Sequence, residues 1–153
     1  MKKLVTQIVL YPFSVFYGII ICIRNWLFDK KILSSTKFDI PIISVGNLSV
    51  GGTGKTPHTE FILGLLQNEW KISFLSCGYK RETKGFILAN ENANAVQLGD
   101  EPFQIYQKFP KVAVAVDEKR VHGVQKLQEK IPNLEAVVLD DAFQHRYIES
   151  GLS

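Results

Sequence analysis

The chain has 153 residues, of which 46% are hydrophobic and 22% charged, and its formal net charge is +3. This length predicts one domain that is large enough to bury a hydrophobic core. The small net charge argues against a nucleic-acid partner, and we expect none, although clustered basic residues would suit an anionic membrane surface. Cys22 and Cys77 lack the spacing of a metal site, which indicates reduced thiols.

The first expected element is an apolar stretch at the N-terminus. No charged residue occurs between Leu4 and Ile23, a length close to the ~20 residues that cross a bilayer. Basic residues flank the stretch on both sides, and aromatic residues are dense in and around it. We favour a membrane-associated helix in residues 1–33 that lies in the plane of the membrane surface. A spanning helix, a core helix of the soluble domain and a cleaved signal peptide are the alternatives.

A glycine-rich segment follows the first expected strand, Ile40 to Val45. Its residues are Ser49, Val50, Gly51, Gly52, Thr53, Gly54, Lys55 and Thr56. A strand, a glycine loop, a Lys-Thr pair and a helix form the pattern of a phosphate-binding loop. Backbone N–H groups would hold the phosphates of ATP, Lys55 would reach the β- and γ-phosphates, and the Thr56 hydroxyl would ligate Mg²⁺. A structural glycine turn is the alternative, because Ser49 stands where the strict pattern has glycine.

A second strand is expected over residues 70–77, and it ends in a basic turn that contains Tyr79 and Arg81. The carboxyl end of this strand should lie near the phosphate loop, so the turn could contact a substrate or a nucleotide phosphate. A solvated loop is the alternative. Residues 86–96 are expected to form a loose hairpin or excursion.

Asp100 and Glu101 begin an expected helix that runs to Phe109. Capping of this helix alone would explain Asp100. The alternative is a functional one, in which the two carboxylates serve an acceptor hydroxyl.

A third strand is expected over 111–116, followed by a helix over 118–131. The residues of this helix expected to face inward are Val121, Val124, Leu127 and Gln128. His122 is interpreted as an ordinary helix residue.

A fourth apolar strand, over 134–139, ends in Asp140 and Asp141. An apolar strand that ends in aspartate is the second signature of phosphate-loop nucleoside triphosphatases, in which the carboxylate holds Mg²⁺ or its water. The order of elements predicts an α/β fold, with a mostly parallel sheet and flanking helices, over residues 34–153.

Four segments in this order, behind an apolar N-terminus, resemble the lipid A 4′-kinase (tetraacyldisaccharide 4′-kinase) family: residues 45–57, 78–81, 99–102 and 140–146. The resemblance covers nearly the whole chain. Ser49 matches the family's own form of the loop, and the apolar N-terminus resembles the family's membrane-associating helix.

The resemblance implies transfer of the γ-phosphoryl group of ATP to the 4′-hydroxyl of a tetraacylated glucosamine disaccharide 1-phosphate, which gives lipid IVA. It implies a location at the cytoplasmic face of the inner membrane of a Gram-negative bacterium. Asp100 would accept the proton of the sugar hydroxyl, and Gln144 and His145 would lie near the transferring phosphate. The resulting candidates are catalytic Asp100, Lys55 and His145, metal-binding Thr56, Asp140 and Asp141, and substrate-binding Tyr79, Arg81, Glu101 and Gln144.

The family's chain is considerably longer, with further strands, a second lobe and a catalytic histidine. We therefore expect the kinase domain to be truncated and poorly active alone. The alternative function is a membrane-associated phosphate-loop nucleotide-binding protein or ATPase without lipid kinase activity. A GTPase is disfavoured because no Asn-Lys-x-Asp motif occurs in the sequence.

Overall fold

The computed structural model describes residues 2–30, 32–46, 55–140, 146–149 and 151. The side chains of residues 2–10, 12, 13 and 55 lie outside this description. The chain divides into two compact units, Met1–Ser35 and Thr36–Ser153. The sequence predicted this boundary at residue 33.

The first unit is built on one helix, α1 (Lys2–Asp29), of 28 residues. Large apolar side chains are exposed along its described part, namely Tyr11, Val15, Phe16, Tyr17, Ile19, Ile20, Ile23 and Trp26. Among the residues that the structure describes, no helix combines the length and the apolar character needed to cross a membrane. Association of α1 with a membrane surface stays a prediction.

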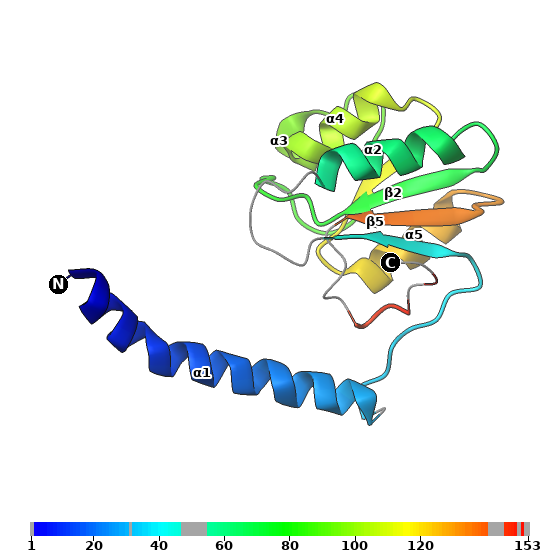
Figure 1. The fold of residues 1–153 in the computed structure, drawn as a ribbon. Coiled ribbons are helices and arrows are strands. Elements are labelled where there is room, and N and C mark those ends of the chain that lie inside the picture. The colour runs from blue at the N-terminus through cyan, green and yellow to red at the C-terminus, as the bar shows by residue number, and fades with distance from the viewer. Residues whose placement is uncertain (1, 31, 47–54, 141–145, 150, 152–153) are drawn as a thin grey trace. The chain divides into compact units, whose positions relative to one another are not determined.

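The second unit contains a five-stranded sheet with the order β1-β5-β2-β4-β3 (Figure 1). Its strands are β1 (Ile42–Val45), β2 (Ile72–Ser76), β3 (Ile87–Leu88), β4 (Ala113–Val116) and β5 (Ala136–Asp140). Strands β1, β5, β2 and β4 run parallel, whereas β3 is antiparallel to β4. The expected α/β fold with a mostly parallel sheet is therefore confirmed.

The segment expected as a loose hairpin instead supplies one short edge strand, β3, and a helical turn, α3 (Ala95–Leu98). Phe86 and Leu88 pack against the hydrophobic core. This packing explains why the segment pairs with β4 rather than with itself.

Three longer helices cover the sheet, namely α2 (Lys55–Leu66), α4 (Asp100–Lys108) and α5 (Arg120–Lys130). Helices α2, α3 and α4 lie on one face, and α5 lies on the other (Figure 1). Pro57 falls in the first turn of α2 as predicted, where its missing N–H costs no helical hydrogen bond.

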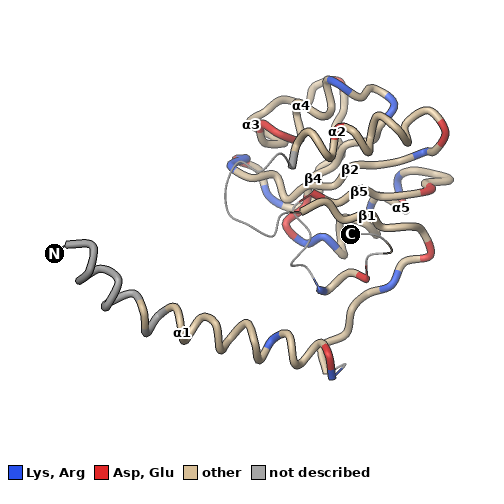
Figure 2. The backbone as a smooth tube through the Cα atoms, in the orientation of Figure 1, with Lys and Arg blue, Asp and Glu red and all other residues tan. Residues whose placement is uncertain are grey.

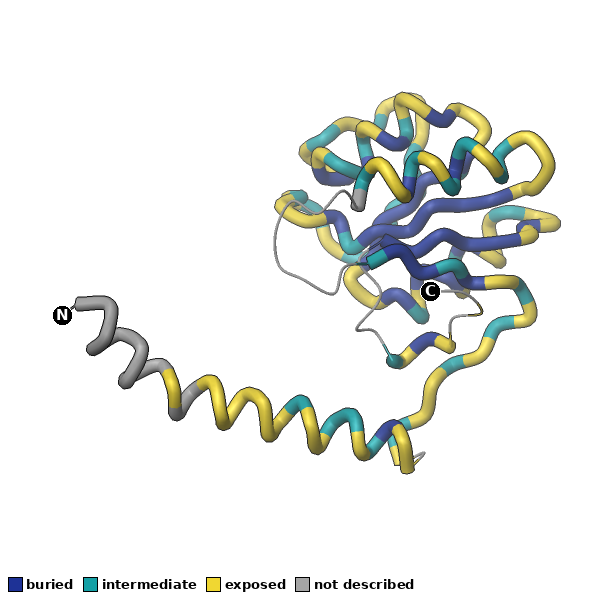
Figure 3. Tube along the Cα trace, viewed as in Figure 1, coloured by how far each residue is buried: buried dark blue, intermediate teal, exposed yellow. Residues whose placement is uncertain are grey.

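Two hydrophobic clusters, one on each face, hold the helices to the sheet. Successive residues of β5 alternate between them: Ala136 and Val138 join the cluster with α2 and α4, whereas Val137 and Leu139 join the cluster with α5. The parallel strands are consequently buried on both faces, as Figure 3 shows. The inward prediction for Gln128 was wrong, because this residue is exposed, whereas its neighbour Leu127 faces inward as predicted.

The prediction that Asp100 caps α4 was also wrong. Gly99 is the N-cap, with a φ of 90°, and no side chain caps the helix. A Cβ atom at Gly99 would lie 2.8 Å from the carbonyl oxygen of Tyr79, so the glycine permits a close approach of the two backbones. Asp100 is thus the first residue of α4, and its side chain is exposed.

Candidate active site

The carboxyl ends of the parallel strands meet at one edge of the sheet. The register places Val45 beside Asp140, Leu75 beside Leu139, and Ser76 beside Val116. Strand β1 leads from this edge into the glycine loop, and α2 begins directly after it. This is the position of a phosphate-binding loop in an open α/β sheet.

Several predicted site residues lie outside the described residues: loop residues 49–54, the side chain of Lys55, and Asp141, Gln144 and His145. Their roles stay predictions. The structure does describe Thr56, Tyr79, Arg81, Asp100, Glu101 and Asp140.

Asp140 is the last residue of β5 and is 5% exposed. The Ser76 hydroxyl donates to its carboxylate Oδ2 at 3.1 Å. The guanidinium of Arg120, at the start of α5, donates to its main-chain oxygen at 2.7 Å. Neither of these partners was predicted from the sequence, and the one sign that could have identified Ser76 was its place as a polar residue at the end of a buried strand.

A cavity of about 390 Å³ lies at this edge of the sheet. Its lining residues are Ser76, Cys77, Tyr79, Lys80, Asp100, Glu101, Pro102 and Asp140. The cavity therefore brings together four of the residues predicted from the sequence. Acidic positions at the start of α4 and basic positions in the loop after β2 lie near one another at this edge (Figure 2).

Asp100 and Lys80 give this cavity opposite charges. Within the described part of the chain, the Asp100 carboxylate has no hydrogen-bond partner and is open to solvent. The Lys80 ammonium lies 5.4 Å from the centre of the Tyr79 ring, which is itself 76% exposed. The cavity is thus lined by the Asp100 carboxylate, which can accept a hydrogen bond from a hydroxyl, and by the Lys80 ammonium, which can bind an anion.

Glu101 is engaged differently from Asp100. Its Oε1 accepts a hydrogen bond of 2.6 Å from the Thr56 hydroxyl, in the first turn of α2. Further along the same two helices, Glu60 accepts from Lys108 at 2.6 Å and from Gln104 at 3.4 Å. Polar contacts therefore join α2 to α4 from the edge of the sheet outward.

The Arg81 guanidinium is bound within the loop after β2. Its side chain is 2% exposed, and it donates to Glu118 Oε1 at 2.6 Å and to the Gly85 carbonyl at 2.8 Å. Glu118 Oε2 accepts from the Gly85 N–H at 3.0 Å. Slight burial would raise the pKa of Glu118, but hydrogen bonds from its own backbone N–H, Arg81 and Gly85 outweigh it and lower that pKa. Arg81 is placed to brace the loop that presents Tyr79 and Lys80.

The oxygen atoms of Asp140 and Thr56 are suitable ligands for a magnesium ion that binds together with a nucleotide. No group of three or more His, Cys, Asp or Glu among the described residues could hold a metal ion. Mg²⁺ characteristically uses one or two carboxylates and completes its shell with waters and substrate phosphates. The buried Asp140 carboxylate and the Thr56 hydroxyl match this mode of binding.

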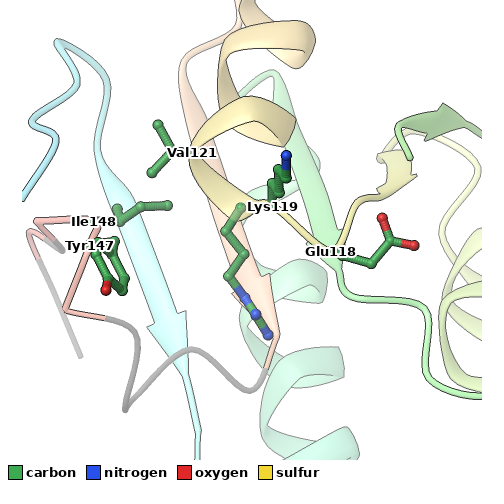
Figure 4. Close-up of a pocket in the computed structure, with 6 residues that line it drawn as sticks. Glu118, Lys119, Val121, Tyr147 and Ile148 are labelled. Atoms are coloured by element: carbon green, nitrogen blue, oxygen red, sulfur yellow. The ribbon is translucent and has the colours of Figure 1, made fainter. Parts of the chain in front are cut away.

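A second cavity, of about 250 Å³, lies beside the start of α5 (Figure 4). Tyr147 and Ile148 lie on one side of it, and Glu118 and Lys119 lie on the other. None of these four residues was predicted from the sequence to belong to a site.

Comparison with known proteins identifies close relatives over nearly the whole chain. The family model of tetraacyldisaccharide-1-P 4′-kinase (LpxK) matches residues 6–153. The tetraacyldisaccharide 4′-kinase of Flavobacterium johnsoniae is 56% identical over 143 residues, which are 94% of this chain and 42% of the relative. That of Bacteroides thetaiotaomicron is 52% identical over 145 residues, covering 94% of this chain and 38% of the relative.

The fold also matches a solved structure. A crystal structure of LpxK from Aquifex aeolicus in complex with ATP has a TM-score of 0.82 and 39% identity, and the match covers 95% of this chain and 47% of that chain. The chain thus spans less than half the length of these relatives: 42% of the F. johnsoniae protein, 38% of the B. thetaiotaomicron protein and 47% of the A. aeolicus chain.

Proposed function

Because the chain belongs to the tetraacyldisaccharide-1-P 4′-kinase family, we propose that it binds ATP and serves transfer of the γ-phosphoryl group to a lipid-borne sugar hydroxyl. The acceptor is the 4′-hydroxyl of a tetraacylated glucosamine disaccharide 1-phosphate, and the product is lipid IVA. The observation that supports this most directly is the cavity at the strand ends, where Asp100 and Asp140 line one space beside the start of α2.

In this proposal Asp100 acts on the acceptor. Its exposed carboxylate accepts a hydrogen bond from the 4′-hydroxyl and takes the proton as the oxygen bonds to the γ-phosphorus. The bond from that phosphorus to the bridging oxygen breaks, and ADP leaves. Lys55, the first residue of α2, would contact the β- and γ-phosphates.

Thr56 and Asp140 would hold the magnesium ion, with Asp141 as a further candidate. When bound there, the ion would neutralise charge on the phosphates. Ser76 and Arg120 fix the end of β5, so that Asp140 stays aimed at the cavity.

The lipid acceptor gives the N-terminal helix a role. An acceptor with four acyl chains stays in a membrane, so a kinase must work at the membrane surface. The exposed aromatic and aliphatic side chains of α1 support binding of this unit to the cytoplasmic face of the inner membrane.

The test compares Lys55→Ala with Asp100→Ala. A chimera in which residues 1–153 replace the matching part of the F. johnsoniae relative is assayed for ATP binding and for phosphate transfer to the lipid acceptor. We expect both variants to abolish transfer, since a positioned base contributes roughly 100- to 10,000-fold. Only Lys55→Ala should greatly weaken ATP binding.

Two results would contradict this proposal. An equally large loss of ATP affinity in both variants would contradict the role of Asp100 as base. ADP release that does not depend on the lipid would favour the alternative, a membrane-associated ATPase.

A further inference from the structure

The hydrogen bond from Thr56 to Glu101 restricts the hydroxyl that is placed to ligate magnesium. A threonine hydroxyl has one proton to donate and two lone pairs to offer. At 2.6 Å the proton points at Glu101 Oε1, so the lone pairs point elsewhere. A carboxylate that fixes the proton therefore also fixes the direction in which this oxygen can bind a cation.

The surroundings of this bond distinguish it from a purely structural link. The helices α2 and α4 are also joined by Glu60, which accepts hydrogen bonds from Lys108 and Gln104, and neither of these bonds involves Thr56. Glu101 lines the cavity that contains Asp140, whereas Glu60 does not. Each of these two glutamates accepts a hydrogen bond across the helices, but of the two only Glu101 lines the cavity.

We propose that Glu101 is a positioning residue for Mg²⁺–ATP, which acts by orienting the Thr56 hydroxyl rather than by binding the metal or the acceptor. This inference rests on the proposed function, because it requires that the chain bind ATP with magnesium. It replaces the substrate contact that the sequence predicted for Glu101 with a contact on the nucleotide side.

The position of Glu101 has a consequence for Asp100. The two residues are neighbours in the first turn of α4, and one faces the acceptor side while the other holds Thr56. A shift of α4 along α2 would therefore move the base and the metal-orienting carboxylate together.

The experiment uses the same chimera, binds a fluorescent ATP analogue to it, and follows the fluorescence as Mg²⁺ is added. Glu101→Ala should lower the apparent affinity for Mg²⁺ by roughly 10- to 100-fold, the usual effect of losing a residue that orients a metal ligand. Binding of the analogue in EDTA should not change. If Glu101→Ala fails to fold, Glu101→Met removes the acceptor at a similar side-chain length and should give the same loss.

Three control variants separate orientation from other effects. Glu101→Gln retains an oxygen acceptor and should recover most of the affinity. Glu60→Ala breaks the neighbouring contacts between the helices and should leave the affinity for Mg²⁺ unchanged. In a double-mutant cycle, adding Glu101→Ala to Thr56→Val should cost nothing further, because both act through one hydroxyl.

The outcomes distinguish this inference from the function on which it rests. If the chimera with the wild-type sequence fails to bind the analogue, the proposed function is overturned. If it binds with a magnesium response but Glu101→Ala behaves like Glu60→Ala, only the role of Glu101 is overturned. Equal losses in Glu101→Gln and Glu101→Ala would show that charge, and not hydrogen-bond acceptance, matters at this position.

Discussion

The two faces of the sheet are joined to their helices in different ways. On the α5 face the contact is tight and mostly apolar: a Cβ atom at Gly123 would lie 2.8 Å from the Leu75 side chain. The polar contacts on this face are made at the start of α5, where Arg120 holds the end of β5 and His122 lies 2.6 Å from Asp117. The other face has an equally buried core, but α2 and α4 also meet through polar side chains, one of which, Glu101, lines the cavity.

This difference indicates a division of roles. The α5 face fixes the sheet and the position of Asp140, whereas the α2–α4 face carries Thr56 and Glu101, which the proposals above assign to nucleotide binding. Removal of a core side chain on the α2–α4 face should therefore weaken ATP binding more than the same removal on the α5 face. This should hold even where the two variants lose the same free energy of unfolding.

Leu63→Ala and Leu127→Ala test this directly and should have the largest effects. Both side chains are 0% exposed, Leu63 in α2 and Leu127 in α5. Each truncation should lower the free energy of unfolding by about 2–5 kcal/mol, through lost burial and the cavity left behind. Urea unfolding measures the loss, and ATP titration at equal folded fraction measures binding.

Only Leu63→Ala should weaken ATP binding in the folded population, because α2 begins at the phosphate loop. An exposed control, Gln128→Ala, should change stability by no more than about 0.5 kcal/mol. Equal losses of ATP affinity in both leucine variants would contradict the division between the two faces.

The sequence was sufficient to predict the parallel strands because β1, β2, β4 and β5 are apolar runs bounded by polar or glycine-containing segments. The short strand β3 could not be predicted, since its two residues owe their conformation to β4 and the core. Helix α4 was predicted with the wrong cap, because the approach of Gly99 to Tyr79 depends on backbones that meet only in the folded chain.

The candidate site was predicted in its residue types but not in its contacts. Motifs identified Asp100, Glu101 and Asp140, which do line one cavity. The bond between Thr56 and Glu101 spans 45 positions, and no local pattern encodes it. Arg81 was expected at the substrate because it is basic, yet its burial against Glu118 is a property of the folded loop.

The loop over residues 77–85 contacts the segment before α4 through Tyr79 and the segment before α5 through Arg81. Two glycines in this loop give the second prediction. Gly78 (φ +69°) and Gly85 (φ +74°) both adopt left-handed backbone conformations. A Cβ atom at Gly78 would lie 2.4 Å from Arg81 Cδ and 3.0 Å from the Leu98 carbonyl oxygen, whereas nothing lies within 4 Å at Gly85. Alanine at either position costs about 1–2 kcal/mol in backbone strain.

Gly78→Ala should therefore destabilise the chain by about 1–3 kcal/mol more than Gly85→Ala, because it adds crowding to strain. It should also weaken nucleotide or acceptor binding, since it separates the loop from the start of α4. Thermal unfolding of the two variants provides the comparison. Equal melting temperatures would mean that the loop can move away from Leu98 without cost.

The smallest effect is expected for Glu118→Gln, which breaks the ion pair that holds this loop on the α5 side. Glu118 is half exposed, so the loss should be about 0.2–1 kcal/mol at neutral pH. The pKa of Glu118 is lowered in the folded chain, so its carboxylate stabilises the fold above the ordinary range for glutamate, about pH 4.3. This stabilisation declines as the pH falls below that range and is gone once the pH is below the lowered pKa of the folded chain.

The difference in stability between wild type and Glu118→Gln should consequently shrink as urea unfolding is repeated from neutral pH down to the acid range. Glu129→Gln is the matched control: hydrogen bonding and charge attraction from Lys126 lower the pKa of Glu129 as well, but this pair lies on the exposed surface of α5. Salt should remove the effect of Glu129→Gln first, because the guanidinium opposite Glu118 is buried and less screened. A Glu118 effect that is equally sensitive to salt would show that Arg81 does not brace the loop through this pair.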